Sequence, residues 1–334
     1  MIKSILKKKI NVFIYQYPNQ DEIKALNKLK DIKIINYQHQ SIFFWIYSNY
    51  NIFKNLYIFY QESKYIISLI HLENDYIFKK WGIKSIFMDN FITYEYNSSI
   101  PLNLLFKTIL MIGRADDRFK RFELGIQAME YISEQIPEVK MNIITNITNI
   151  EYIKNIINSL CLEKYIYFIE YTPLPEKYFQ YISLNIITSI SESFSLALSE
   201  TKIYGIPNIF MGLDYLSTVN GGIINICDDS PETLAKESIK LLINYEYRKQ
   251  LGKEARKSMK KFENKTLLKK WIQLILSIYN NDDYYEKLRK FNQKISENKA
   301  LNLLKNQIMF LNKRKNYIKN ISEITNFLFN EINE

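Results

Sequence analysis

The sequence predicts an α/β protein with two domains, each built around a parallel sheet with helices on both faces. Short, continuously apolar segments alternate with amphipathic ones, a pattern typical of buried parallel strands joined by helices. The chain has 334 residues, which is long enough for two domains. Hydrophobic residues make up 47% of it, so we expect packed cores rather than a disordered chain.

The alternation of strand and helix is clearest in the second half of the chain. We expect strands at 108–112, 140–144, 165–169, 184–188, 208–211 and 223–226, and helices at 122–135, 150–160 and 194–204. A long helix is then expected to start at 230–232. Ser230 can cap it, Pro231 has a φ that suits the first turn, and the charge of Glu232 is favourable at a helix N-terminus. A basic helix follows at 265–279, with Trp271 on its apolar side.

The first hundred residues are predicted to form a smaller α/β domain. Its expected strands are 10–15, 32–37, 56–60, 65–69 and 85–88, with a helix at 22–29. The end of the chain, 281–334, is polar and is predicted to be a basic helical tail.

The charge of the chain narrows the class of its partners. The formal net charge is +10, which suits nucleic acid, acidic lipid or a phosphorylated substrate. Neither an aromatic ribonucleoprotein-type motif nor a helix-turn-helix signature is present, so we do not expect nucleic acid as a partner. The basic segments at 265–270 and 313–315 could touch an anionic membrane, although a solvated helix face explains them equally well.

Cysteine and histidine usage indicates a cytoplasmic protein without a zinc cluster. Cys161 and Cys227 belong to no C-x-x-C pair, and we expect both to be reduced core residues. Residues 1–9 lack the apolar region of a signal peptide, and the apolar run at 42–53 is too short to span a bilayer. A soluble or peripheral location follows.

The most informative motif follows the predicted strand 184–188. Glu192 and Glu200 are separated by seven residues, several of them small and polar, and Gly205-x-Pro207 follows. A helix that starts at the end of a strand points free N–H groups at a ligand and attracts phosphate. If 192–200 were helical, the two carboxylates would lie about 12 Å apart along the axis, similar to the reach of a nucleotide-sugar. An ordinary amphipathic helix with two solvated glutamates is the alternative interpretation.

A second group of candidates follows the predicted strand 108–112. Gly113 and Arg114 end this strand, and Lys120 lies in the loop after it. Ligands of parallel sheets bind at the carboxyl ends of the strands. We therefore expect Arg114 and Glu192 to face one crevice.

These landmarks, in this order, resemble the donor-binding domain of family-4 glycosyltransferases of the GT-B fold, the "glycosyl transferases group 1" module. The resemblance covers residues 109–262 well, about half of the chain. It implies an acceptor-side domain at 1–105, a nucleotide-sugar-binding domain at 106–262 and a helix at 263–280 that returns to the first domain. The first domain is much shorter than is usual in this family.

The resemblance also implies roles for individual residues. Arg114 and Lys120 would hold the donor diphosphate, Glu192 the transferred sugar and Glu200 the ribose. Gly113 and the N–H groups of Phe194 and Ser195 would contact the phosphates. Where Ser195 stands the family usually has glycine, so its side chain could crowd the phosphates or donate to them. Arg121 or Arg118 could replace Lys120, because the loop before it is longer than usual.

His39 is the remaining candidate, with a catalytic or acceptor-positioning role. It follows the predicted strand 32–37, at the edge that faces the donor domain in this family. A surface or core histidine is the alternative, and His71 is a weaker candidate of the same kind.

Two hypotheses for function follow. The first is a retaining hexosyltransferase that acts on a nucleotide-diphosphate sugar and a glycan or lipid-linked acceptor, in surface polysaccharide synthesis. It would need neither metal nor cofactor, since no D-x-D motif occurs. The second is a non-catalytic interaction protein that keeps the donor fold but has a degraded acceptor domain.

Overall fold

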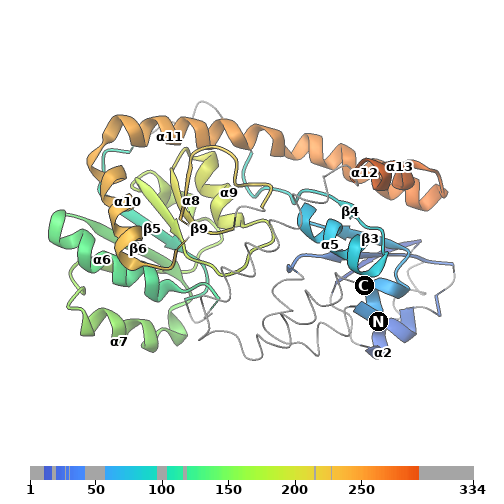
Figure 1. Ribbon diagram of the computed structural model, residues 1–334, viewed down its shortest axis with the longest axis horizontal. Coiled ribbons are helices and arrows are strands. Elements are labelled where there is room, and N and C mark those ends of the chain that lie inside the picture. The colour runs from blue at the N-terminus through green and yellow to red at the C-terminus, as the bar shows by residue number, and fades with distance from the viewer. Residues whose placement is uncertain are drawn as a thin grey trace.

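The fold consists of two parallel β-sheets with their helices, as the computed structural model in Figure 1 shows. The structure describes residues 11–16, 20–26, 28–29, 31–41, 57–95, 104–115, 119–213, 216–226 and 228–292. The strand order is β1-β2-β3-β4 in the first sheet and β10-β9-β8-β5-β6-β7 in the second. This arrangement confirms the predicted α/β class with two Rossmann-like domains.

The first domain is small, and its strands lie side by side in the order in which they occur along the chain. Its elements are β1 (Val12–Tyr15), α2 (Gln20–Leu26), β2 (Lys33–Gln38), β3 (Tyr65–Ser68), α5 (His71–Trp81) and β4 (Ile86–Phe87). The central strand β3 is buried along its whole length. Each strand pairs in parallel with the next, so the carboxyl ends of β2 and β3 lie side by side.

One strand predicted for this domain is wrong. Residues 57–62 are helical, whereas 56–60 was predicted as a strand. Phe59 and Tyr60 are buried while Ile58, Gln61 and Glu62 are exposed, which is a helical rather than an alternating pattern. A short apolar run cannot distinguish the two structures by periodicity alone.

The second domain reproduces the predicted alternation closely. Its strands are β5 (Thr108–Ile112), β6 (Lys140–Thr145), β7 (Ile166–Glu170), β8 (Leu184–Ile187), β9 (Asn208–Met211) and β10 (Ile223–Ile226). Its helices are α6 (Phe122–Gln135), α7 (Glu151–Ser159), α8 (Glu176–Phe179), α9 (Leu196–Ile203), α10 (Pro231–Ile243) and α11 (Tyr245–Ser258), with short 3₁₀ turns η1 (Ile147–Asn149) and η2 (Met259–Phe262). Ser230 caps α10 as predicted, by accepting a hydrogen bond from the Thr233 amide.

The strand order of this sheet indicates at which point along its edge a ligand would bind. Strand β5 lies between β6 and β8, so the connections leave it in opposite directions. Such a switch point opens a crevice at the carboxyl ends of the two neighbouring strands. Gly113 and Arg114 follow β5, and residues 188–195 follow β8, so the predicted site residues gather at this point.

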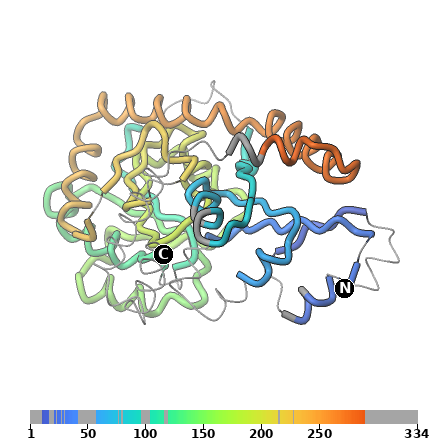
Figure 2. The backbone as a smooth tube through the Cα atoms, turned by 45° about the vertical axis from the view of Figure 1, so that its right-hand side comes forward, coloured from blue at the N-terminus to red at the C-terminus, as the bar shows by residue number. Residues whose placement is uncertain are grey.

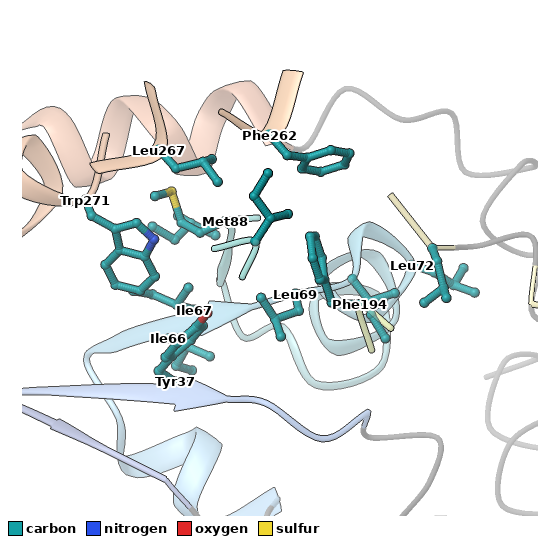
Figure 3. Packing of buried hydrophobic residues seen from close by; sticks show 14 of the residues in the cluster. Tyr37, Ile66, Ile67, Leu69, Leu72, Met88, Phe194, Phe262, Leu267 and Trp271 are labelled. Atoms are coloured by element: carbon teal, nitrogen blue, oxygen red, sulfur yellow. The ribbon is translucent and has the colours of Figure 1, made fainter. Parts of the chain in front are cut away.

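A long helical run joins the two domains. Helix α11, η2 and α12 (Asn264–Asn280) follow one another along one edge of the molecule, and α13 (Tyr284–Asn292) packs against α12 (Figures 1 and 2). Trp271 of α12 is buried and meets Tyr37 of β2 edge to face at 4.9 Å. Figure 3 shows Leu267 and Trp271 reaching from α12 toward Ile66, Ile67 and Tyr37.

The core is continuous between the domains. One cluster of buried side chains combines residues of β2, β3 and α5 with residues of α9, η2 and α12. Another fills the second domain between its sheet and α6, α7 and α10. The continuous cluster fixes the carboxyl ends of β2 and β3 close to the start of α9.

Three further sequence predictions can be placed. Cys161 is exposed and ends α7 in the left-handed conformation (φ 54°), so the prediction of a core cysteine is wrong for it. Cys227 lies outside the described residues, as do 42–53 and the tail beyond 292. In the described parts of the chain, no helix combines the length and apolar character needed to cross a bilayer.

Candidate functional site

Gly113 and Arg114 begin the site at the end of β5. Gly113 has a φ of 148°, and its amide donates to the carbonyl of Ile144 on the adjacent strand. The side chain of Lys120 passes close by, because a Cβ on Gly113 would lie 3.8 Å from Lys120 Cδ. Arg114 is exposed immediately after this glycine. The two cations predicted for the diphosphate therefore share one end of the sheet.

Lys120 and Glu192 form an ion pair at this edge. Lys120 Nζ lies 2.6 Å from Glu192 Oε1, and the same oxygen accepts a hydrogen bond from Ser189 Oγ at 2.7 Å. Both side chains are largely withdrawn from solvent, with exposed fractions of 27% for Lys120 and 13% for Glu192. The structure thus brings together two of the residues predicted from separate parts of the sequence.

Backbone contacts hold the two loops that carry this pair. The Ile190 amide donates to the Phe119 carbonyl at 2.8 Å, and Thr188 Oγ1 donates to the Lys120 carbonyl at 2.6 Å. These bonds join the loop after β5 to the loop after β8. The position of Lys120 opposite Glu192 therefore depends on the backbone rather than on the ion pair alone.

Arg121 has a structural role in the same loop, contrary to its place among the candidates for the phosphate-binding cation. Its side chain is only 3% exposed, and its Nε donates to the Thr188 carbonyl at 2.8 Å. Its guanidinium also pairs with Asp229 at 2.8 Å. Arg121 is therefore committed to joining loops inside the domain, and Arg118, the other alternative, lies outside the described residues.

The turn into α9 differs from the predicted geometry. The helix begins at Leu196, so Glu192 lies in the preceding loop and the axial distance of about 12 Å does not apply. Ser195 has φ 59° and ψ 85°, a left-handed conformation that a right-handed helix cannot include. The helix therefore starts only after Ser195. This conformation gives a physical reason why glycine would suit the position. The free N–H groups of the first helical turn lie directly after it.

Phe194 and Ser193 connect this turn to the first domain. The Phe194 ring is buried 5.4 Å from Phe262, and Figure 3 shows it among Leu69, Leu72 and Phe262. Ser193 Oγ donates to the carbonyl of His39. Phe194 is thus an anchor between the domains, and only its backbone is available to a ligand.

His39 lies at the end of β2, beside this turn. Its imidazole packs against Tyr37 at 4.3 Å, and burial lowers its pKa from the ordinary value. A lowered pKa keeps the ring neutral near pH 7, when it can accept a proton or a hydrogen bond. Its carbonyl, rather than its ring, makes the contact with Ser193.

Glu200 is held by residues that sequence reasoning did not identify. It is 8% exposed, and its Oε1 accepts a hydrogen bond from Thr93 Oγ1 at 2.5 Å. Burial raises the pKa of Glu200, whereas the Thr93 bond lowers it and the charge of Glu176 raises it further. Tyr94 Oη in turn donates to Glu176 Oε2 at 2.6 Å. Thr93 and Tyr94 belong to the segment between the two sheets, so no local pattern could have revealed this contact.

His71 starts α5 and stacks on Phe87 with the ring centroids 3.6 Å apart. Burial and the nearby charge of Lys261 lower its pKa to about 4. Glu73, two residues on, is buried and accepts a hydrogen bond from Ser68 Oγ. His71 is therefore a neutral ring at the end of β3.

Lys202 lies in the buried part of α9 and holds the loop after β9 through hydrogen bonds. Its Nζ donates to the carbonyls of Thr218 and Asn220 at 2.5 and 2.8 Å. Thr218 Oγ1 then donates to the Phe194 carbonyl at 2.8 Å. Burial lowers the pKa of Lys202 to about 7, with a further lowering by Lys261. The backbone of the turn before α9 thus depends on a buried lysine.

Within the described ranges, no cluster of three or more His, Cys, Asp or Glu side chains is arranged to hold a metal ion. Arg114 and Lys120 are the cationic side chains predicted for this end of the sheet.

Comparison by sequence shows a match over the second domain. Residues 95–258 match the family described as Glycosyl transferases group 1. A comparison with curated proteins finds no match.

Comparison by structure finds the same architecture in several solved proteins. Sucrose-phosphate synthase from Thermosynechococcus elongatus is 14% identical, with a TM-score of 0.69, over 84% of this chain and 77% of that one. A variant of S. aureus TarM in complex with fondaparinux, alpha-GlcNAc-glycerol and UDP is 20% identical, with a TM-score of 0.66, over 83% of this chain and 58% of that one. The pneumococcal O-GlcNAc transferase GtfA in complex with UDP and GlcNAc is 16% identical, with a TM-score of 0.67, over 83% of this chain and 59% of that one. The chain therefore has the GT-B fold and spans less than two thirds of the length of TarM and GtfA.

Proposed function

Because residues 95–258 form a glycosyl transferases group 1 domain within a GT-B fold, we propose that the chain is a retaining glycosyltransferase. It transfers a hexose from a nucleotide-diphosphate sugar to a hydroxyl of a glycan or lipid-linked acceptor, in the synthesis of a surface polysaccharide. The observation that carries the proposal is the pairing of Lys120 with Glu192 at the switch point of the second sheet, beside Gly113 and Arg114.

In this proposal the donor diphosphate binds where the cations gather. Arg114 contributes a planar group with several donors, and Lys120 a compact charge. The first N–H groups of α9 add a helix N-terminus, which favours an anion. When the bond between the sugar C1 and the diphosphate oxygen breaks, these groups stabilise the negative charge that develops on the leaving group. No metal ion is required for this role.

The two glutamates bind the rings at either end of the diphosphate. Glu192 accepts hydrogen bonds from hydroxyls of the transferred sugar, and its pairing with Lys120 holds the carboxylate in position. Glu200 accepts from the ribose through the oxygen that Thr93 does not use. Interactions with the nucleotide hold C1 near the acceptor hydroxyl, which reduces the entropic cost of reaction.

The acceptor side is formed by the first domain. The acceptor oxygen bonds to C1 on the face that the diphosphate leaves, while the bond from C1 to the diphosphate oxygen breaks. The proton of the acceptor hydroxyl passes to the departing diphosphate, so the step balances. His39, at the end of β2, contacts the donor-side turn through its carbonyl and could orient this acceptor hydroxyl through its ring. Reaction takes place in the cytoplasm, where nucleotide-sugars are available, with the protein soluble or peripheral on the inner membrane face.

A purified-protein assay tests the proposal. The full-length chain is incubated with a panel of nucleotide-sugars, beginning with UDP-sugars because TarM and GtfA were crystallised with UDP. Release of nucleoside diphosphate by transfer to an acceptor or by hydrolysis is measured, with Glu192→Gln as the inactive control. If no donor is turned over but nucleoside diphosphate still binds, the second hypothesis of a non-catalytic interaction protein is favoured.

A further inference from the structure

Helix α12 has an outer face that combines apolar and basic side chains. Leu268, Ile272, Leu276 and Tyr279 are each about half exposed, at 50%, 48%, 51% and 50%. Their spacing of four, four and three residues places them on one stripe of the helix. We call this stripe, with Lys265 and Lys269, the outer face of α12.

The opposite side of the same helix already has its partners. Leu267, Trp271, Leu274 and Ile278 are buried in the core cluster that the two domains share. The exposed stripe therefore does not serve the packing of α12 on the first domain. Scattered exposed apolar residues need no explanation, whereas four in register on one helix indicate a surface that contacts something apolar.

The charge next to this stripe has one dominant sign. Between residues 253 and 270 the chain has seven lysines, one arginine and two glutamates. Lys253, Lys257, Lys260, Lys265 and Lys269 are exposed. They lie along the consecutive elements α11, η2 and α12, which run along one edge of both domains in Figures 1 and 2. Acidic residues follow only beyond the end of α12, at Asp282, Asp283 and Glu286.

From these observations we infer that the outer face of α12 docks on an anionic membrane surface. An interfacial helix buries an apolar stripe at the boundary between head groups and acyl chains, while flanking lysines contact anionic lipid head groups. Nucleic acid would satisfy the lysines but would leave the apolar stripe in water. The basic first half of α12 contacts the head groups most closely, because acidic residues follow only after Asn281.

This docking would place both domains along the membrane. Helix α11 belongs to the second domain and α12 packs on the first, so one continuous edge carries the two sheets together. A lipid-linked acceptor would then meet the first domain without leaving the bilayer. Docking itself does not depend on the proposed transfer reaction, so its test is independent of activity.

The test is cosedimentation of the full chain with vesicles. We expect the chain to sediment with vesicles of phosphatidylcholine and phosphatidylglycerol and to remain in solution with phosphatidylcholine alone. Each lysine near an anionic surface strengthens binding about fivefold, so Lys265→Gln with Lys269→Gln should weaken it about 30-fold. Leu268→Ser with Ile272→Ser should weaken it about tenfold or more, because the exposed half of each side chain no longer enters the membrane.

Matched controls keep the result interpretable. Lys154→Gln with Lys164→Gln removes the same charge from the second domain, and Tyr152→Ser removes an exposed apolar group from α7. Both controls should sediment like the unmodified chain, and circular dichroism should show all variants folded. The proposal is overturned if the chain ignores anionic vesicles, if the charge control loses as much binding as the α12 variant, or if the Leu268/Ile272 variant binds normally. Retention of a DNA duplex without retention of vesicles would instead assign the face to nucleic acid.

Discussion

Replacement of Thr93 by valine tests how the donor ribose is recognised. Thr93 Oγ1 donates to Oε1 of the buried Glu200 over 2.5 Å, and valine removes this hydroxyl while keeping the shape of the side chain. A hydrogen bond to a charged group contributes about 1.5–3 kcal/mol. The bond is also present in the free protein, so only part of this energy contributes to nucleotide binding. We therefore expect the free energy of UDP binding to weaken by about 1–2 kcal/mol, which is about 5- to 30-fold in affinity.

The pH dependence of the affinity should change in the same variant. Burial raises the pKa of Glu200 and the Thr93 bond opposes this rise, so Thr93→Val should raise the pKa further. Ribose recognition needs the carboxylate, which is present above this pKa and is lost as the pH falls through it. The affinity of the variant should therefore begin to fall at a higher pH than that of the unmodified chain.

Titration calorimetry measures the affinity of two variants for two nucleotides and so tests whether Thr93 acts through Glu200. Thr93→Ser keeps the hydroxyl and should bind UDP almost normally. With 2′,3′-dideoxy-UDP, which lacks the ribose hydroxyls, Thr93→Val and the unmodified chain should bind equally. If valine and serine behave alike, if the valine variant binds UDP more tightly, or if its loss persists with the dideoxy nucleotide, then Thr93 does not act through Glu200 on the ribose.

Three further predictions concern stability, measured by urea unfolding. Ser195→Gly should raise the free energy of unfolding by about 1 kcal/mol, because glycine adopts the left-handed conformation of φ 59° without strain, whereas Ser195→Ala should give no such gain. The pKa of Lys202 is lowered from 10.5 to about 7, so between these pH values the unfolded chain binds more protons and stability should rise with pH. Lys202→Met should lack this rise, and parallel profiles for the two proteins would contradict the assignment. Arg121→Ala should destabilise the chain by about 3 kcal/mol, because it removes the largely buried ion pair with Asp229 and the donor to the buried Thr188 carbonyl. A loss below about 1 kcal/mol would show that the loops do not depend on Arg121.

Much of the second domain could be predicted from local patterns. Helix α6 and strands β5, β9 and β10 lie at the predicted residues, because continuous apolar runs bounded by glycine, proline and caps define their ends. The first domain was harder, as the helix at 57–62 shows, since its apolar run is short. The sequence order of Gly113, Arg114, Lys120 and Glu192 indicated a common site, and the structure brings Lys120 and Glu192 into contact.

The contacts that local patterns could not predict are long-range. Thr93 reaches Glu200 from the segment between the sheets, and Lys202 reaches the Phe194 carbonyl only through Thr218. Arg121 was an alternative to Lys120 as the phosphate-binding cation because the loop before them is longer than usual, yet its pairing with Asp229 involves a residue more than one hundred positions away. Such partners become visible only when the fold has brought separate loops together.

The central claim is that cations at the end of β5 bind the diphosphate of a nucleotide-sugar. Titration calorimetry of UDP and of uridine against the unmodified chain and Arg114→Ala tests it most directly. We predict that UDP binds far more tightly than uridine, and that Arg114→Ala lowers the UDP affinity by about 1.5–3 kcal/mol without changing that of uridine. Equal affinity for UDP and uridine, or a UDP affinity that Arg114→Ala leaves unchanged, would contradict the account.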